Sequence, residues 1–482
     1  MNIAQLEPKA IWKNFSLINA IPRASKKEDK IVQFMLDFGN KLGLETQTDA
    51  IGNVLIRKPA TPGMENRKTV VLQSHLDMVH QKNNSTEFDF DRQGIDMYID
   101  GDWVKAKGTT LGADNGLGVA AIMGILESEE IEHPAIEALF TIDEETGMTG
   151  AKGLKGGFLK GDILLNLDTE EDDEIDIGCA GGIDVTATKS IIKVKANPEA
   201  ITFELTLGGL QGGHSGMDIH KGLGNANKIM NDALLSVENL IQLSTLKGGS
   251  LRNAIPRESV AVFTCDRNDE KNVISSLERS ITKMKTQYLK LDPQFNYTLK
   301  KVNSVENVLS KNDQNQLFSS IQDAHNGVFK MSDFMDDLVE ASNNIAKITV
   351  DDKMITVECL TRSSVEESKM EVANGLKTTF ENRGFQVKFS GDYPGWSPNP
   401  TSPILSVLEK LYEEIFEKKP KVVACHAGLE CGILGSHYPD LDMISFGPAI
   451  RGAHSPDEKA SISSSQKFWK YLLSILKNTP NR

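Results

Sequence analysis

Residues 70–79 read VVLQSHLDMV, a short apolar run that ends on a histidine and, two positions later, an aspartate. Apolar runs of this length that are rich in valine and leucine are typical of a buried strand. His75 and Asp77 are two positions apart, so on an extended chain both side chains point to the same face. A strand that ends on such a pair predicts an α/β fold with its chemistry at the strand ends.

Four other motifs each offer one further carboxylate or imidazole. They are TLGADNGLG (110–118), FTIDEETG (140–147), LLNLDTE (164–170) and RGAHSPDE (451–458). With His75, the candidate metal ligands are Asp114, Glu145, Asp168 and His454. Two metal ions roughly 3.5–4 Å apart, with a bridging carboxylate and a shared water, need about this set of ligands. Oxygen and nitrogen ligands without a thiolate suit Zn²⁺, Co²⁺ or Mn²⁺.

Each motif taken alone has an ordinary structural explanation. Asp114 can cap the helix that follows it. The acidic run at residues 143–145 can be a solvated loop, and a single histidine such as His454 can be structural. The prediction of a two-metal centre therefore depends on the five motifs together. It favours an enzyme over a binding module.

Composition excludes several other classes of protein. With 482 residues, the chain is longer than one hydrophobic core usually supports, so we expect two or three domains. A net charge of -14 argues against a nucleic-acid partner, which would call for a basic face. The five cysteines are scattered without a CxxC pair, so neither a disulfide framework nor a thiolate metal site is expected. The sequence shows neither a signal peptide nor an apolar run of membrane-spanning length, and we expect a cytoplasmic protein.

The order of strand and helix patterns predicts two domains. Up to about residue 187, apolar strands alternate with helical segments such as GLGVAAIMGILESEE, which is typical of an α/β sheet. From 188 to 398, strand-rich pieces are separated by long helical ones, as in an α+β domain. The chain then returns to helix, strand and the His454 loop. We therefore expect a discontinuous catalytic domain, 1–187 and 399–482, with an inserted domain at 188–398.

The motifs resemble those of a known enzyme family. SHLDM, GADNG, DEETG, GGHSG, RNAIP, HAGLECG and GAHSPDE occur in an order similar to that of the M20 metallopeptidases, in particular their aminoacyl-histidine dipeptidase branch. The resemblance extends from about Trp12 to the last helix. It implies a zinc-peptidase-like catalytic domain with a mixed sheet flanked by helices. It also implies an inserted α+β lid and two divalent ions, with Zn²⁺ the first expectation.

The resemblance also implies a role for each candidate residue of the catalytic domain. Asp114 would bridge the two ions, with His75 and Asp168 on one ion and Glu145 and His454 on the other. Glu144 would be the general base, and Asp77 would orient His75. The residues alone do not decide which of the two adjacent glutamates is the base and which is the ligand.

Substrate recognition is expected to involve the inserted domain. A tetrahedral oxyanion needs a hydrogen-bond donor, and His214 in GGHSG is the candidate. A free carboxylate calls for a bidentate arginine, for which Arg362 is favoured over Arg252, with assistance from Asn253. For a free ammonium group we expect Glu430 in HAGLECG. His426 of the same motif is an alternative pocket residue.

These expectations describe a metal-dependent dipeptidase that acts on unblocked dipeptides, Xaa-His dipeptides such as β-Ala-His included. An N-acyl amino acid amidase would share the metal ligands and is the alternative. A non-catalytic binding protein is the third hypothesis. We expect a small dipeptide as the binding partner and expect no binding to nucleic acid or membrane. The sequence leaves open whether the protein forms a homodimer.

Overall fold

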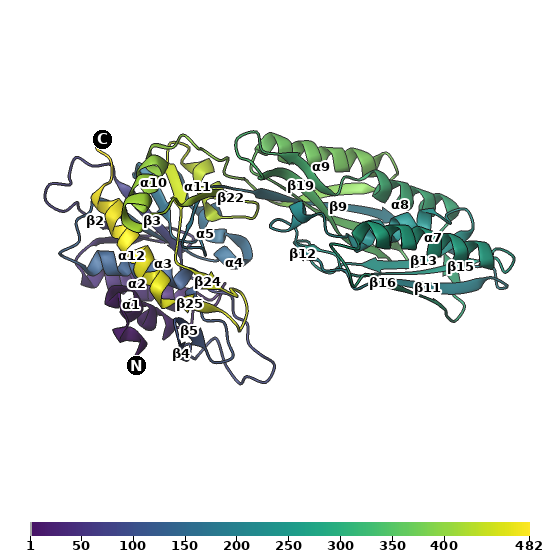
Figure 1. Ribbon diagram of the computed structural model, residues 1–482, viewed down its shortest axis with the longest axis horizontal. Coiled ribbons are helices and arrows are strands. Elements are labelled where there is room, and N and C mark those ends of the chain that lie inside the picture. Colours follow the sequence, from purple (N-terminus) through teal and green to yellow (C-terminus); the bar gives the residue numbers. More distant parts are fainter. Residues whose placement is uncertain (1) are drawn as a thin grey trace. The chain divides into compact units, whose positions relative to one another are not determined.

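The computed structural model describes residues 2–482 and divides into two compact units (Figure 1). The first unit comprises the chain up to Gly178 together with Pro398–Ala424 and Leu429–Arg482. The second comprises Cys179–Ser397 and Cys425–Gly428. The chain passes from the first unit to the second at Gly178, earlier than the expected 187. The reason is that strand β9 (Gly181–Ser190) pairs with strands of the second unit.

The first unit is built around an eight-stranded mixed sheet. β3 is parallel to both of its neighbours, β6 and β7, and β23 is parallel to β7. β2 is antiparallel to β1 and to β6, and β8 is antiparallel to β23. In sheet order the strands are β1 (Glu45–Thr48), β2 (Val54–Lys58), β6 (Ile136–Thr141), β3 (Val70–His75), β7 (Ile163–Asn166), β23 (Asp442–Ser445), β8 (Glu174–Cys179) and β22 (Lys421–Cys425).

Helices flank this sheet, and α3 (Ala113–Glu127) is the most buried of them. All of its residues except Asp114 and Glu127 are buried, and it packs against β3 and against α1. A helix that is apolar on all sides belongs in a core. The other helices are α1 (Lys9–Asn19), α2 (Asp29–Lys41), α4 (Glu144–Gly147), α5 (Thr149–Gly153), α10 (Pro403–Phe416), α11 (Glu430–His437) and α12 (Ile462–Lys477).

A second, four-stranded sheet completes the first unit. It joins a hairpin from the first half of the chain to strands near its end. Its order is β24 (Ile450–Arg451), β25 (Lys459–Ser461), β5 (Trp103–Ala106) and β4 (Met97–Asp100). The loop between β24 and β25 carries His454, so this sheet ties that loop to the body of the unit.

The second unit contains a nine-stranded antiparallel sheet, coloured teal to green in Figure 1. Helices α6, α8 and α9 pack against the sheet, and α7 packs against α6. The strands are β16 (Asn296–Lys301), β11 (Ile201–Gly208), β15 (Ser259–Cys265), β13 (Ile241–Gly248), β19 (Val339–Val350), β20 (Met354–Ser363), β9, β21 (Gln386–Tyr393) and β18 (Gly327–Met331). The helices are α6 (Ala226–Leu235), α7 (Glu270–Tyr288), α8 (Lys311–Asp323) and α9 (Glu366–Glu381).

These two architectures confirm the predicted fold class: a mixed α/β sheet flanked by helices in the first unit and an α+β arrangement in the second. From Phe203 to Gly208, residues of β11 alternate between buried and half-buried, as expected for a sheet with one covered face. Across residues 2–482, the structure contains no helix that combines the length and the apolar character needed to cross a membrane.

Candidate metal centre

The candidate ligands come together because three neighbouring parallel strands of the first unit end at one edge of the sheet. β3 ends on His75, β6 leads into Glu145, and β7 leads into Asp168. Parallel strands place their carboxyl ends side by side, which is where α/β proteins bind ligands. The start of α3 adds Asp114, and the β24–β25 loop adds His454.

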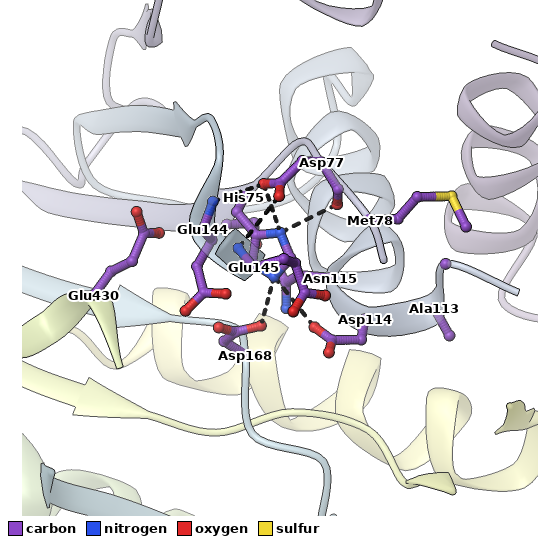
Figure 2. Close-up of polar contacts among 12 residues, drawn as sticks. His75, Asp77, Met78, Ala113, Asp114, Asn115, Glu144, Glu145, Asp168 and Glu430 are labelled. Atoms are coloured by element: carbon purple, nitrogen blue, oxygen red, sulfur yellow. Dashed lines mark hydrogen bonds and ion pairs between the residues drawn. The ribbon is translucent and has the colours of Figure 1, made fainter. Parts of the chain in front are cut away.

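The five side chains form two groups that share Asp114. In the first group, Nε2 of His75 lies 3.2 Å from Oδ1 of Asp114 and 3.5 Å from Oδ1 of Asp168 (Figure 2). In the second, Nε2 of His454 lies 3.1 Å from Oδ2 of Asp114 and 3.0 Å from Oε2 of Glu145. Within each group the ligand atoms lie within 4.8 Å of one another. Asp114 thus presents one oxygen to each group, as a bridging carboxylate would.

The donor set fits divalent metal ions. Each group supplies one imidazole nitrogen and carboxylate oxygens, with no thiolate, which suits Zn²⁺, Co²⁺ or Mn²⁺. Oε1 of Glu145 is buried without a hydrogen-bond partner. A buried carboxylate oxygen in that state is costly unless a cation satisfies it.

The electrostatics of the cluster also favour a cation. Hydrogen bonds to Asp114 and Glu145 raise the pKa of His454 to about 11. Burial lowers the pKa of His75, but the charge of Asp168 and the hydrogen bonds to Asp114 and Asp168 outweigh this effect and hold the pKa well above its usual value. The carboxylates therefore stabilise positive charge between them. A metal ion would compete with these protons for the same ligands.

Asp77 links His75 to the turn that carries the two glutamates. It is fully buried, and its Oδ1 lies 3.3 Å from Nδ1 of His75. The same carboxylate accepts the backbone N–H groups of Glu144 at 3.0 Å and of Glu145 at 3.3 Å. One side chain thereby orients a ligand and fixes the first turn of α4. Carboxylates behind metal-bound histidines commonly have this orienting role.

The geometry distinguishes the two adjacent glutamates, whose roles the residue pattern alone could not tell apart. Glu145 belongs to the second ligand group, whereas Glu144 belongs to neither. In Figure 2 the carboxylate of Glu144 points toward Asp168. Burial raises the pKa of Glu144 well above its usual value, and the charges of Asp168 and Glu430 raise it further, although His75 opposes the shift. A carboxylate beside the ligands with a raised pKa is suited to proton transfer.

Glu430 lies in the first unit but is not placed to bind an ammonium group. Its side chain is fully buried, and its Oε2 accepts hydrogen bonds from Nε2 of Gln73 and Oγ1 of Thr141, both at 2.6 Å. Burial raises its pKa to about 7. The expected contact with a substrate ammonium needs an accessible carboxylate, so this burial argues against it. The placement favours a supporting role, in which Glu430 holds Gln73 and Thr141.

The remaining expected substrate residues belong to the second unit. His214 lies on β12 (Gly213–His214), which pairs with β14 (Ala254–Ile255), and Asn253 is an exposed residue just before β14. Nδ1 of His214 accepts the backbone N–H groups of Gly216 at 3.3 Å and Met217 at 3.1 Å. An accepting Nδ1 carries no proton, so the neutral ring has its proton on Nε2, as a donor to an oxyanion requires.

Arg362 lies on β20 and is buried, with Nη1 donating to the hydroxyl of Tyr393 at 3.0 Å. The charge of Arg362 acts on His426, whose Nε2 lies 2.8 Å from the hydroxyl of Ser342. Burial, reinforced by this charge, lowers the pKa of His426 to about 3. His426 therefore stays neutral under the influence of the buried guanidinium group of Arg362.

Several residues that hold this site were not among the sequence predictions. The hydroxyl of Ser25 donates to Oδ2 of Asp77 at 2.8 Å, and Oε1 of Glu28 accepts the backbone N–H of Asp143 at 3.0 Å. Arg23 and Glu458 contact the turn before Asp114. Glu458 lies inside a motif that the sequence marked, but its sequence context carries no sign of these long-range contacts.

Comparison with known proteins agrees with this geometry. A family model described as peptidase family M20/M25/M40 matches residues 71–478. The chain is 41% identical over 481 residues to the cytosol non-specific dipeptidase of Escherichia coli K12, covering 99% of each chain. The chain belongs to peptidase family M20/M25/M40. Members of this family are metallopeptidases, so the chain is a hydrolase that acts on peptide bonds and uses divalent metal.

Two solved structures share the fold of this chain. The aminoacylhistidine dipeptidase of Vibrio alginolyticus superposes with a TM-score of 0.93 at 44% identity, covering 100% of this chain and 99% of that chain. The aminopeptidase PepT of Bacillus cereus superposes with a TM-score of 0.58 at 15% identity, covering 98% of each chain. The second similarity concerns the fold alone. The first extends over both units.

Proposed function

We propose that this M20 metallopeptidase is a dipeptidase that hydrolyses the peptide bond of unblocked dipeptides, Xaa-His dipeptides included. The proposal rests on one observation: the two ligand groups share Asp114. Glu144 lies beside these groups and belongs to neither of them. The substrate class is supported by the names of two relatives that match nearly the whole chain, a non-specific dipeptidase and an aminoacylhistidine dipeptidase. The same names favour a peptidase over an N-acyl amino acid amidase.

The metal complement in this proposal is two divalent ions, with Zn²⁺ the first expectation and Co²⁺ or Mn²⁺ compatible. His75, Asp114 and Asp168 would hold one ion, and Asp114, Glu145 and His454 the other. When bound, such ions supply Lewis acidity to the scissile carbonyl and make a water molecule more acidic. The word cytosol in the name of the Escherichia coli relative supports a cytosolic location for this chain as well.

The protein's own residues would then move protons and hold the substrate. Glu144 accepts a proton from the attacking water and returns it to the leaving amine nitrogen. Asp77 keeps the ring of His75 in place. Nε2–H of His214 donates to the developing oxyanion, and Arg362, assisted by Asn253, pairs with the substrate carboxylate.

The proposal is tested by metal analysis of the purified protein followed by assays on three substrates: β-Ala-His, an unblocked dipeptide without histidine, and an N-acetylated amino acid. We expect hydrolysis of both dipeptides and very slow hydrolysis of the acetylated compound. An enzyme that prefers the acetylated compound would be an amidase and would refute the proposal.

The matched variant for this assay is Glu144→Gln, which keeps the size of the side chain and removes the base. General-base catalysis contributes roughly 10²–10⁴-fold, so kcat should fall by about this factor. The metal content should stay equal to that of the wild type, because Glu144 is in neither ligand group. Retained turnover would reject Glu144 as the base.

A further inference from the structure

The turn that leads into Asp114 is bound by one carboxylate from the far end of the chain. Glu458 is buried, and its Oε2 accepts the backbone N–H groups of Leu111 at 2.7 Å and Gly112 at 2.9 Å. Its Oε1 accepts those of Ala113 at 2.7 Å and Asp114 at 3.3 Å. Four consecutive backbone donors therefore converge on a single side chain.

A buried arginine, Arg23, binds the same turn by donating a hydrogen bond to a backbone carbonyl oxygen of the turn. Nη2 of Arg23 donates to the carbonyl oxygen of Gly112 at 2.5 Å and to Oδ1 of Asn19 at 3.0 Å. Nη1 of Arg23 donates to the carbonyl oxygens of Leu76 and Asp77, both at 3.1 Å. Arg23 therefore connects the Asp114 turn to the loop that follows His75, and its charge attracts that of Glu458.

The turn has almost no room to adopt another position. Gly112 has φ 71°, in the left-handed region, and a Cβ there would lie 2.5 Å from Nη2 of Arg23 and 2.8 Å from Sδ of Met78. At Gly116, in the first turn of α3, a Cβ would lie 2.7 Å from the same Nη2 atom. The glycines allow the backbone to lie directly on the guanidinium group.

Regular helix geometry does not set the direction of Asp114. Asp114 has φ -79° and ψ 112°, and Asn115 has φ -103° and ψ 30°, so both depart from the helix that follows them. What holds this segment in place is a set of contacts to its flanks. These are the bonds to Glu458 and Arg23 and the bond from Nδ2 of Asn115 to the carbonyl oxygen of Leu167 at 2.6 Å.

Glu458 also belongs to the loop that carries His454. The two residues are four positions apart, and the backbone N–H of Glu458 donates to the carbonyl oxygen of Ser455 at 3.0 Å, which closes the loop before β25. The carboxylate of Glu458 thus joins the loop of one proposed ligand to the turn of the bridging ligand. These two ligands, His454 and Asp114, both belong to the second ligand group.

We propose that Glu458 is a positioning residue for Asp114. Together with Arg23, which binds the same turn, it holds Asp114 so that each carboxylate oxygen of Asp114 faces one ligand group. The inference deepens the proposed metal centre and rests on it. Partners that orient metal ligands typically contribute 10- to 100-fold to metal affinity. The loss of Glu458 should therefore weaken metal binding in the free protein, with no substrate present.

The test is Glu458→Gln. The amide keeps one accepting oxygen and turns an NH₂ group toward two of the four backbone donors. Zn²⁺ affinity of the metal-free protein is measured by competition with a chromophoric chelator, and the absorption spectrum of the Co²⁺-loaded protein reports the ligand geometry. We expect affinity to fall by roughly 10- to 100-fold and the Co²⁺ spectrum to change.

The matched control is Glu137→Gln. Glu137 is equally buried, accepts the backbone N–H groups of Lys160 at 2.7 Å and Gly161 at 2.9 Å, and lies near the opposite end of β6 from Thr141. It should lower the unfolding temperature without changing metal affinity or the Co²⁺ spectrum. Wild-type affinity and spectrum in Glu458→Gln would overturn the inference, as would equal losses of affinity in both variants.

A second variant tests the same turn by changing Arg23. Arg23→Lys keeps the charge and loses the forked donor group, so it should also weaken Zn²⁺ binding. It provides the test if Glu458→Gln does not fold, and wild-type affinity in Arg23→Lys would count against the inference. Failure of the wild type to bind metal would instead refute the proposed function, so the two failures are distinguishable.

Discussion

Asp176 provides a test of the structure that is independent of catalysis. It lies on β8, is 6% exposed, and its Oδ2 accepts a hydrogen bond from the hydroxyl of Thr169 at 2.7 Å. Burial raises the pKa of this carboxyl from 3.8 to about 7, against the opposing effect of the Thr169 bond, and the charges of Glu174 and Asp168 add to the rise. The folded protein therefore retains a proton that the unfolded chain releases.

The sign of the effect on stability follows from proton linkage. Because the folded-state pKa is the higher one, the stability contributed by this proton is complete below pH 3.8 and is lost as the pH rises toward about 7. One unit of pKa corresponds to about 1.4 kcal/mol, so the loss is about 2 kcal/mol at pH 5 and about 4 kcal/mol at pH 8. Asp176→Asn keeps the shape and cannot ionise, so it avoids this loss.

The assay is differential scanning calorimetry of the wild type and Asp176→Asn, both saturated with metal, at pH 5 and pH 8. The variant should gain roughly 2–3 kcal/mol relative to the wild type between the two pH values, the difference of the two losses. For a unit of this size, the difference in unfolding temperature should then change by roughly 5–10 °C in favour of the variant. The same temperature difference at both pH values would refute the buried, protonated state of Asp176.

Two further predictions concern the metal centre and the substrate. Asp114→Ala should lose both ions, since Asp114 belongs to both ligand groups, and metal analysis that still finds two bound ions would reject the bridging role. Arg362→Lys should raise KM for free dipeptides by roughly 10-fold, the equivalent of about 1.4 kcal/mol, because lysine cannot pair bidentately with a carboxylate. It should also discriminate less against C-terminally amidated dipeptides than the wild type does, and an unchanged preference would rule out the carboxylate contact.

The sequence predicted those parts of the site that depend on local pattern. His75 and Asp168 follow apolar strands, and the glycines around Asp114 mark a tight turn, so chain order and residue type sufficed for them. Glu458 and Arg23 could not be found in this way. They contact a turn about 345 and 90 residues away in the chain, and their contacts are to backbone groups that no side-chain pattern records.

The boundary near residue 178 shows a related limit. The segment IDIGCAGGIDVTATK has the same β-pattern throughout, yet β8 belongs to the sheet of the first unit and β9 to that of the second. Periodicity identifies a strand but not the sheet that the strand joins. Glu430 shows the same limit for side chains, because its position in a glycine-containing motif gave no sign of its hydrogen bonds to Gln73 and Thr141.

The order of the ligands along the chain has a consequence for biosynthesis. His75, Asp114 and Asp168, which form the first ligand group, are all translated before the second unit begins at Cys179. His454 follows that unit, as does β23, the strand that fills the gap between β7 and β8. A growing chain therefore carries one complete group of proposed metal ligands and an unfinished sheet while more than two hundred residues of the second unit emerge. In the proposed two-ion site, the ligands of one ion would thus be complete on the ribosome well before those of the other.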